Sequence, residues 1–265
     1  MVKWEHKLKE GDSMQHKFRS LLCLALCAIF TLSLTLPALA AENEQDCGAK
    51  LMAITFDDGP GDYTLDLLAA LEERGVKATF FITGSRVSAY PGVLDAIVAG
   101  GHQLANHTHN HKNLNTLTAQ QVSDEINAAR DLLVEAGGDQ TYYVRAPYGN
   151  ANKTVKSVVN APLIYWSVDP EDWKYRNADT VCTNIVEGAF DGAIVLAHDI
   201  HSTTVDGVLM AIDKLQAKGY EFVTVNELFR RRGVTLEKGH TYSSCKPTGT
   251  DLGPVSVPTV TETAS

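Results

Sequence analysis

From residue 51 onward, short apolar runs alternate with segments whose apolar residues recur at the helical period of about 3.6. The apolar runs predict buried strands over residues 51–56, 78–82, 102–105, 143–145, 163–165, 193–196 and 221–224. The segments between them predict helices over residues 64–74, 92–99, 118–135, 178–187 and 207–217. In the first helix, Leu65, Leu68 and Leu71 share one face, and Thr118 is a favourable N-cap for the longest helix.

This regular alternation indicates the fold class. Strands that are apolar throughout are typical of parallel sheets whose faces are covered by helices. About seven strand–helix units fit an α/β fold of the incomplete or distorted (β/α) barrel type in a single domain, and a doubly wound open sheet is the alternative. In either architecture, polar residues directly after the strands meet at the carboxyl edge of the sheet, which is where we look for chemistry.

The two ends of the chain depart from this pattern. Residues 21–36 are largely apolar, follow Lys17 and Arg19, and precede Ala38-Leu39-Ala40, a cleavage site typical of a secretory signal peptide. A retained membrane anchor is the alternative, although the run is shorter than the roughly 20 apolar residues of a span. We predict a signal peptide or anchor over 1–40, a linker over 41–50, one main domain over 51–240, and a Ser/Thr/Pro-rich tail over 241–265.

The charge of the chain indicates which kinds of partner to expect. The 265 residues carry a net charge of −9, and removal of residues 1–40, with five basic and three acidic residues, makes it about −11. Because the chain has no basic run, nucleic acid is not expected as a partner.

Cys47 and Cys245 lie at opposite ends of the main domain and could form a disulfide outside the cell, whereas Cys182 falls in a helical pattern and should be buried.

An acidic pair follows the first predicted strand. Asp57 and Asp58 are adjacent carboxylates that repel one another and lose hydration at the end of a buried strand, and a bound cation would remove that cost. Gly59 and Pro60 turn the chain sharply here, as expected of a loop at the rim of a sheet. An acidic surface turn without a function is the alternative.

Two histidines four residues apart form the second cluster. On one helical turn His107 and His111 would share a face, a spacing with which two imidazoles can bind one divalent ion, while His109 would point to solvent. Together with a carboxylate of the acidic pair they predict a metal site with open positions for water and substrate. Zn²⁺ suits this ligand set best, and Co²⁺ or another divalent ion could compete.

Three further clusters follow later strands. Residues 145–149 combine Arg145, which could pair with a carboxylate, with an irregular backbone whose amides can point into a site. Residues 169–173 are acidic and end in Trp173, which either stacks on a sugar or packs in the core. His198 directly follows an apolar strand, and beside a metal it could be a general acid rather than a structural residue.

In order and spacing, these five clusters resemble the five motifs of the polysaccharide deacetylases of NodB-homology type, carbohydrate esterase family 4. The resemblance covers residues 51–239, and its most specific parts are residues 55–60, 107–111 and 145–149. It implies a distorted (β/α) barrel and metal-dependent removal of acetyl groups from a polysaccharide. Ala146 departs from the proline that many relatives have, which should only loosen this loop slightly.

The resemblance implies a role for each residue of the first three motifs. Asp57 is expected to be the general base. Asp58, His107 and His111 are expected to bind the metal ion. Arg145 would orient Asp57.

The same resemblance extends to the remaining motifs. His198, oriented by Asp172, is expected to be the general acid, and the backbone amide of Tyr148 would bind the oxyanion. Trp173 and Leu196 would surround the acetyl methyl group. The residues expected to contact the substrate are Pro147, Tyr148, Trp173 and Leu196.

These expectations combine into one hypothesis about function. The chain is expected to be a secreted N-deacetylase of an amino-sugar polymer. Peptidoglycan N-acetylglucosamine is favoured, because the signal segment and the small single domain resemble bacterial wall-modifying members. A chitin-oligomer deacetylase and an acetyl-xylan esterase are alternatives within the enzyme class. A noncatalytic carbohydrate-binding protein is the alternative of another class, against which the intact Asp57, Arg145 and His198 argue.

Overall fold

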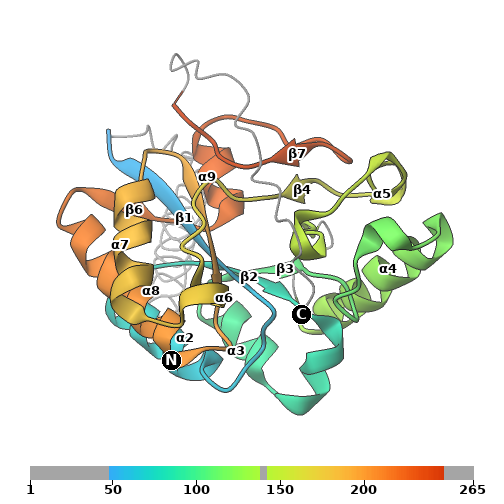
Figure 1. Cartoon of the computed structure of the whole chain (residues 1–265), viewed down its shortest axis with the longest axis horizontal. Coiled ribbons are helices and arrows are strands. Elements are labelled where there is room, and N and C mark those ends of the chain that lie inside the picture. The colour runs from blue at the N-terminus through green and yellow to red at the C-terminus, as the bar shows by residue number, and fades with distance from the viewer. Residues whose placement is uncertain (1–47, 138–141, 248–265) are drawn as a thin grey trace, which may run out of the picture. The chain divides into compact units, whose positions relative to one another are not determined.

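The computed structural model describes residues 48–137 and 142–247 (Figure 1). The predicted signal segment, Cys47 and most of the predicted tail lie outside these residues. All described residues belong to a single unit, Asp46–Ser265. In the described part of the chain, no helix combines the length and the apolar character that crossing a membrane requires.

A parallel sheet forms the centre of the fold. Its strands follow the order β3 (Gln103–Asn106), β2 (Thr79–Ile82), β1 (Lys50–Asp57) and β5 (Ala193–His198), and β6 (Tyr220–Phe222) also pairs with β1. A second parallel pair joins β4 (Leu163–Ile164) to β7 (Thr241–Tyr242).

Isolated β-bridges extend this sheet beyond its two outer strands, β3 and β5. Val144 bridges Asn106 at the end of β3 and Leu163 in β4, and Val168 bridges Val195 in β5. The strand order therefore continues from β3 to β4 and returns to β5, which confirms the predicted distorted (β/α) barrel rather than an open sheet.

Side chains alternate across β1, and this alternation divides the core. One face packs against the outer helices in the largest apolar cluster and carries Met52, Ile54 and Phe56. The other face belongs to a second cluster and carries Leu51 and Ala53, together with Phe81 and Ile194 from β2 and β5. Because successive side chains point to opposite faces, Thr55 and Asp57 lie on the inner face with Leu51 and Ala53.

Helices connect and cover the strands. The α-helices are α2 (Thr64–Glu73), α3 (Val93–Ala99), α4 (Ala119–Glu135), α5 (Lys153–Val158), α6 (Asp172–Tyr175), α7 (Ala178–Gly188), α8 (Ser202–Gln216) and α9 (Val225–Arg231). Short 3₁₀ turns are η1 (Gly84–Ala89), η2 (Leu114–Thr116) and η3 (Pro147–Gly149). Figure 1 shows α7 and α8 side by side, and they form the most extensive helix–helix contact among the described residues.

Several local predictions are confirmed. Thr118 caps α4, and its side chain and that of Gln121 form a reciprocal capping box. Cys182 is fully buried in α7. The strands and helices of the first half of the chain begin and end within two residues of their predicted positions.

Other predictions are wrong in an instructive way. Leu65 is 54% exposed, whereas Thr64 and Leu67 are buried in α2. The Thr64 hydroxyl can be buried there because it donates to a buried carboxylate, that of Asp199. The helix predicted from residue 207 begins at Ser202, and the strand predicted over residues 143–145 is reduced to the bridge at Val144.

The predicted tail overlaps the folded domain. Thr241 and Tyr242 form β7, Ser244 bridges Ala193, and Cys245 is buried and donates its backbone N–H to Gly192. The boundary predicted at residue 241 was therefore placed too early, since these residues complete the pairing around β4 and β5.

The α7–α8 contact yields a test of the packing. A Cβ atom on Gly207 would lie 2.6 Å from the carbonyl oxygen of Ala178 and 2.7 Å from Cβ of Val181. Gly207→Val should therefore force the helices apart and lower the free energy of unfolding by about 1–3 kcal/mol, measured by urea denaturation. Asp206→Val, on the exposed neighbouring position, is the matched control. Equal stability of the two variants would contradict this packing.

Candidate active site

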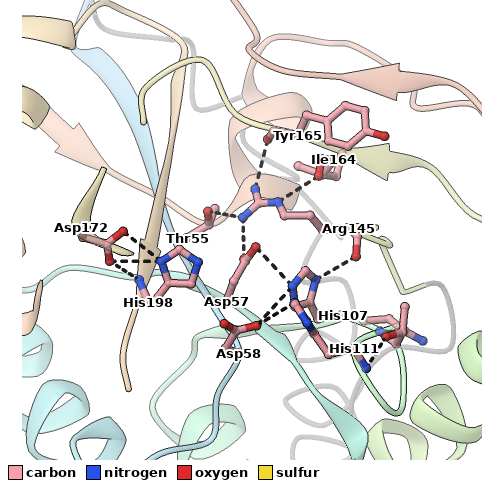
Figure 2. A network of polar contacts seen from close by, with 12 residues as sticks. Thr55, Asp57, Asp58, His107, His111, Arg145, Ile164, Tyr165, Asp172 and His198 are labelled. Atoms are coloured by element: carbon pink, nitrogen blue, oxygen red, sulfur yellow. Dashed lines mark hydrogen bonds and ion pairs between the residues drawn. The ribbon is translucent and has the colours of Figure 1, made fainter. Parts of the chain in front are cut away.

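A buried guanidinium organises the inner face of the barrel. Arg145 is fully buried, and its Nη1 donates to Oδ1 of Asp57 at 2.6 Å and to the hydroxyl of Thr55 at 2.7 Å. Its Nε and Nη2 donate to the carbonyl oxygens of Ile164 and Tyr165, each at 3.0 Å (Figure 2). The predicted pairing of Arg145 with Asp57 is therefore present in the structure.

The turn after β1 points Asp58 away from Asp57. Asp58 adopts a left-handed backbone conformation with φ of 68°. The N–H of Gly61 donates to the Thr64 hydroxyl at 2.8 Å, and this hydroxyl donates to Oδ2 of Asp199 at 2.5 Å. A Cβ atom on Gly59 would lie 2.7 Å from Oδ1 of Asp199, so only glycine fits at this close approach.

Two imidazoles converge on Asp58. Nε2 of His107 lies 3.5 Å and Nε2 of His111 lies 3.1 Å from Oδ1 of Asp58. The predicted helical turn is wrong, because residues 107–111 are irregular and both Thr108 and His111 are left-handed, with φ of 67° and 53°. These two backbone reversals bring the histidines together. His109 is half-buried against Gly84, not directed to solvent as predicted.

The three side chains fit a divalent cation. Their possible ligand atoms all lie within 4.8 Å of one another. Nδ1 of His107 donates to the carbonyl of Arg145 at 2.8 Å, which directs Nε2, the atom that could bind a cation, toward Asp58. Oδ1 of Asp58 is buried and has no hydrogen-bond partner of suitable geometry. Electron-rich atoms at such distances repel one another unless a cation lies among them.

The electrostatics of the cluster agree with this fit. Burial opposes a charge on His107, but the carboxylates of Asp57 and Asp58 raise its pKa. Burial, together with His107, lowers the pKa of His111. The pKa of Asp58 is held well below its usual range by the imidazoles, although burial acts in the opposite direction. The site thus keeps Asp58 ionised and His111 neutral, the forms in which these side chains bind a metal ion, and the raised pKa of His107 reflects the negative charge around its ring.

A second imidazole–carboxylate pair lies on the other side of the acidic pair. Figure 2 shows Asp57 and Asp58 between His198 and the two converging histidines. Oδ1 of Asp172 accepts from Nδ1 of His198 at 2.9 Å, and Oδ2 accepts from the His198 N–H and the Thr204 hydroxyl, each at 2.9 Å. Burial disfavours the imidazolium, but Asp172 raises the pKa of His198 to about 9. His198 is therefore protonated at neutral pH and can donate a proton.

The rim residues predicted to contact substrate differ in exposure. Tyr148 is left-handed with φ of 60°, is 44% exposed, and packs edge-on against His111 with ring centroids 4.9 Å apart. Trp173, next to Asp172, is 43% exposed. Pro147 is buried, and Leu196 is buried in a small cluster with two aromatic rings. Contact of these four residues with a substrate stays a prediction.

Several polar residues that support the site were not predicted from the sequence. Asp199 directly follows His198, so its position after a strand was the only available signal. Thr64 and Thr204 are buried hydroxyls near the N-terminal ends of α2 and α8, and nothing in their sequence surroundings distinguishes them from ordinary helix starts.

Comparison with known proteins decides the family. A sequence model of the polysaccharide deacetylase family matches residues 44–162, which contain the acidic pair, both converging histidines and Arg145. The solved structure of the peptidoglycan deacetylase PdaC from Bacillus subtilis is 36% identical, with a TM-score of 0.68, and the match covers 70% of this chain and 92% of that one. The chain belongs to the polysaccharide deacetylase family. This membership confirms the resemblance carried by the five clusters, and with it the distorted barrel.

Two other members of this deacetylase family show its range. Peptidoglycan-N-acetylglucosamine deacetylase PgdA from Listeria monocytogenes is 42% identical over 194 residues, which are 73% of this chain but only 41% of that protein. This chain therefore spans less than half of that relative's length. A family 4 acetyl xylan esterase from Clostridium thermocellum, solved with a cobalt ion, is 28% identical with a TM-score of 0.70, over 74% of this chain and 98% of that one.

The His198–Asp172 pair yields a pH prediction. The His198 imidazole should lose its proton as the pH rises through about 9, and Asp172→Asn should move this titration to lower pH because it removes the stabilising charge. NMR of the imidazole protons measures both values. His102 is an internal control, because burial lowers its pKa to about 4 and it lies on another part of the sheet. An unchanged His198 titration in Asp172→Asn would contradict the assignment.

Proposed function

We propose that this protein is a secreted, metal-dependent hydrolase that removes N-acetyl groups from peptidoglycan, at N-acetylglucosamine. One observation carries the proposal. Asp57 and His198 are direct partners in the parallel register of β1 and β5, and the cluster of Asp58, His107 and His111 lies beside them. A proton acceptor, a proton donor and a cation site thus meet at one sheet edge, which binding alone does not need.

Asp58, His107 and His111 would hold the ion. Two imidazoles and one carboxylate are a ligand set typical of catalytic zinc, so Zn²⁺ is the proposed ion, and Co²⁺ is the alternative. When bound, a divalent ion supplies Lewis acidity toward the acetyl carbonyl and the attacking water.

Asp57 is the proposed general base. Its Oδ1 is paired with Arg145, and its Oδ2 lies 3.7 Å from Nε2 of His107, on the side of the cation site. Oδ2 takes a proton from water as the water oxygen attacks the acetyl carbon. The backbone N–H of Tyr148 donates to the oxyanion that forms, an interaction that typically contributes about 3 kcal/mol in such sites.

His198 is the proposed general acid. An amine cannot leave as an anion, so the C–N bond breaks as His198 transfers its proton to the nitrogen. Asp172 keeps its negative charge throughout and holds the imidazole by Nδ1, which leaves Nε2 to face the substrate. The products are acetate and a free amino group on the sugar.

The choice of substrate rests on relatives and on the N-terminal segment. PgdA and PdaC are named as peptidoglycan deacetylases, PdaC for N-acetylmuramic acid, and the predicted signal peptide agrees with export toward the cell wall. The likeness to an acetyl xylan esterase supports O-deacetylation as the second candidate, because the same groups can hydrolyse an acetate ester.

A parallel assay tests the activity and separates the substrates. The protein is incubated with peptidoglycan, chitin oligomers and acetyl-xylan, and acetate and new primary amines are measured. We expect equal amounts of acetate and amine from peptidoglycan, loss of both with a chelator, and recovery with Zn²⁺. Release of acetate from acetyl-xylan, with no new amines from the other polymers, would identify an esterase instead. Absence of acetate with all three polymers would favour a noncatalytic carbohydrate-binding protein.

Substitutions of the two neighbouring acids separate their roles. Asp57→Asn should retain the metal and lower kcat by roughly 10²-fold or more, because the base is lost while the ligands remain. Asp58→Ala should lose the metal in elemental analysis. Asp66→Asn, at an exposed position of α2, is the control for loss of one negative charge. Wild-type kcat in Asp57→Asn would exclude it as the base.

A further inference from the structure

A buried acid on α4 contacts the segment that carries His111. Glu125 is 5% exposed and lies outside the ligand cluster. Its Oε2 accepts the backbone N–H of Asn110 at 2.7 Å, and its Oε1 accepts Nδ2 of Asn110 at 2.9 Å and Nζ of Lys112 at 2.9 Å. These donors are the residues immediately before and after His111.

The position of His111 depends on an irregular backbone. Its φ of 53° belongs to the left-handed region, which costs a residue with a side chain conformational energy. His107, in contrast, is fixed by two hydrogen bonds, one from its backbone N–H to Ile82 and one from Nδ1 to the Arg145 carbonyl. The His111 backbone N–H donates only to the Thr108 hydroxyl, at 3.1 Å, within the same segment.

Backbone N–H groups of Gly84 and Ser85 hold the first half of the segment through the carbonyls of residues 108 and 109, and Glu125 links its second half, around His111, to a rigid element. The contact joins residues 15 apart in sequence, and it anchors the segment to α4, the longest helix among the described residues. We propose that Glu125 is a positioning residue for the metal site, which holds His111 in place and thereby sets the affinity for the ion. This inference rests on the proposed metal site, and it assigns to Glu125 no contact with metal or substrate.

A carboxylate is required for this contact. Both oxygens of Glu125 accept, and together they accept from three donors. In Glu125→Gln the amide would offer one oxygen, and its NH₂ group would face either Asn110 or Lys112, which also donate. Glu125→Gln keeps the size of the side chain but weakens its contacts with residues 110 and 112. A change in metal affinity would therefore come from these polar contacts and not from a cavity in the packing.

Metal affinity is the readout. The full chain is stripped of metal, and Zn²⁺ is titrated in competition with a chromophoric chelator. We expect Glu125→Gln to weaken Zn²⁺ binding by roughly 10- to 100-fold, as loss of a residue that orients a ligand typically does. Asp124→Asn, the exposed neighbour on α4, removes the same charge and should bind like wild type.

A second variant keeps the inference testable if Glu125→Gln fails to fold by circular dichroism. Asn110→Ala removes the side-chain contact from an exposed position and should weaken Zn²⁺ binding to a smaller extent, because the backbone N–H of residue 110 still donates to Glu125. Wild-type affinity in Glu125→Gln, or in Asn110→Ala where the first variant does not fold, would overturn the inference. Failure of the wild type itself to bind Zn²⁺ would instead remove the proposed metal site, and this inference with it.

Discussion

The burial of the Arg145 guanidinium is the constraint on which the interior of this barrel depends. A charge removed from water must be matched by a partner charge and by acceptors for its N–H groups, and a buried ion that loses its partner typically costs about 3–5 kcal/mol. Asp57, Thr55 and the two carbonyls at the end of β4, those of residues 164 and 165, meet these needs. Asp57, the proposed general base, therefore also stabilises the fold, because it joins β1 to Arg145 and, through Arg145, to β4.

The same constraint explains how two adjacent acids can lie at one sheet edge. Asp57 points along the inner face of β1 toward the guanidinium, whereas the left-handed turn at Asp58 directs the next carboxylate toward two imidazoles. Asp57 thus faces a guanidinium, and Asp58 faces two imidazoles. These neighbours offset the repulsion between the two carboxylates. Different neighbours, rather than different residue types, give the two carboxylates different electrostatic environments.

The sequence predicted the fold and the site to different depths. Strands were placed well because continuous apolar runs are sufficient to recognise buried parallel strands, and the polar residues after them marked the edge of the sheet at which the candidate site lies. The helical turn expected between His107 and His111 was wrong, because spacing alone does not reveal left-handed residues. Leu65 was misplaced and Glu125 and Asp199 were overlooked for a common reason: their environment depends on contacts between distant segments.

The register between β1 and β5 has a consequence for how such a chain can diversify. The separation of Asp57 from His198 is fixed by backbone hydrogen bonds between neighbouring parallel strands, not by the loops around them. Loops at the rim can therefore change length and composition over evolution, and adapt to polymers of different shape, without changing the separation of these two side chains.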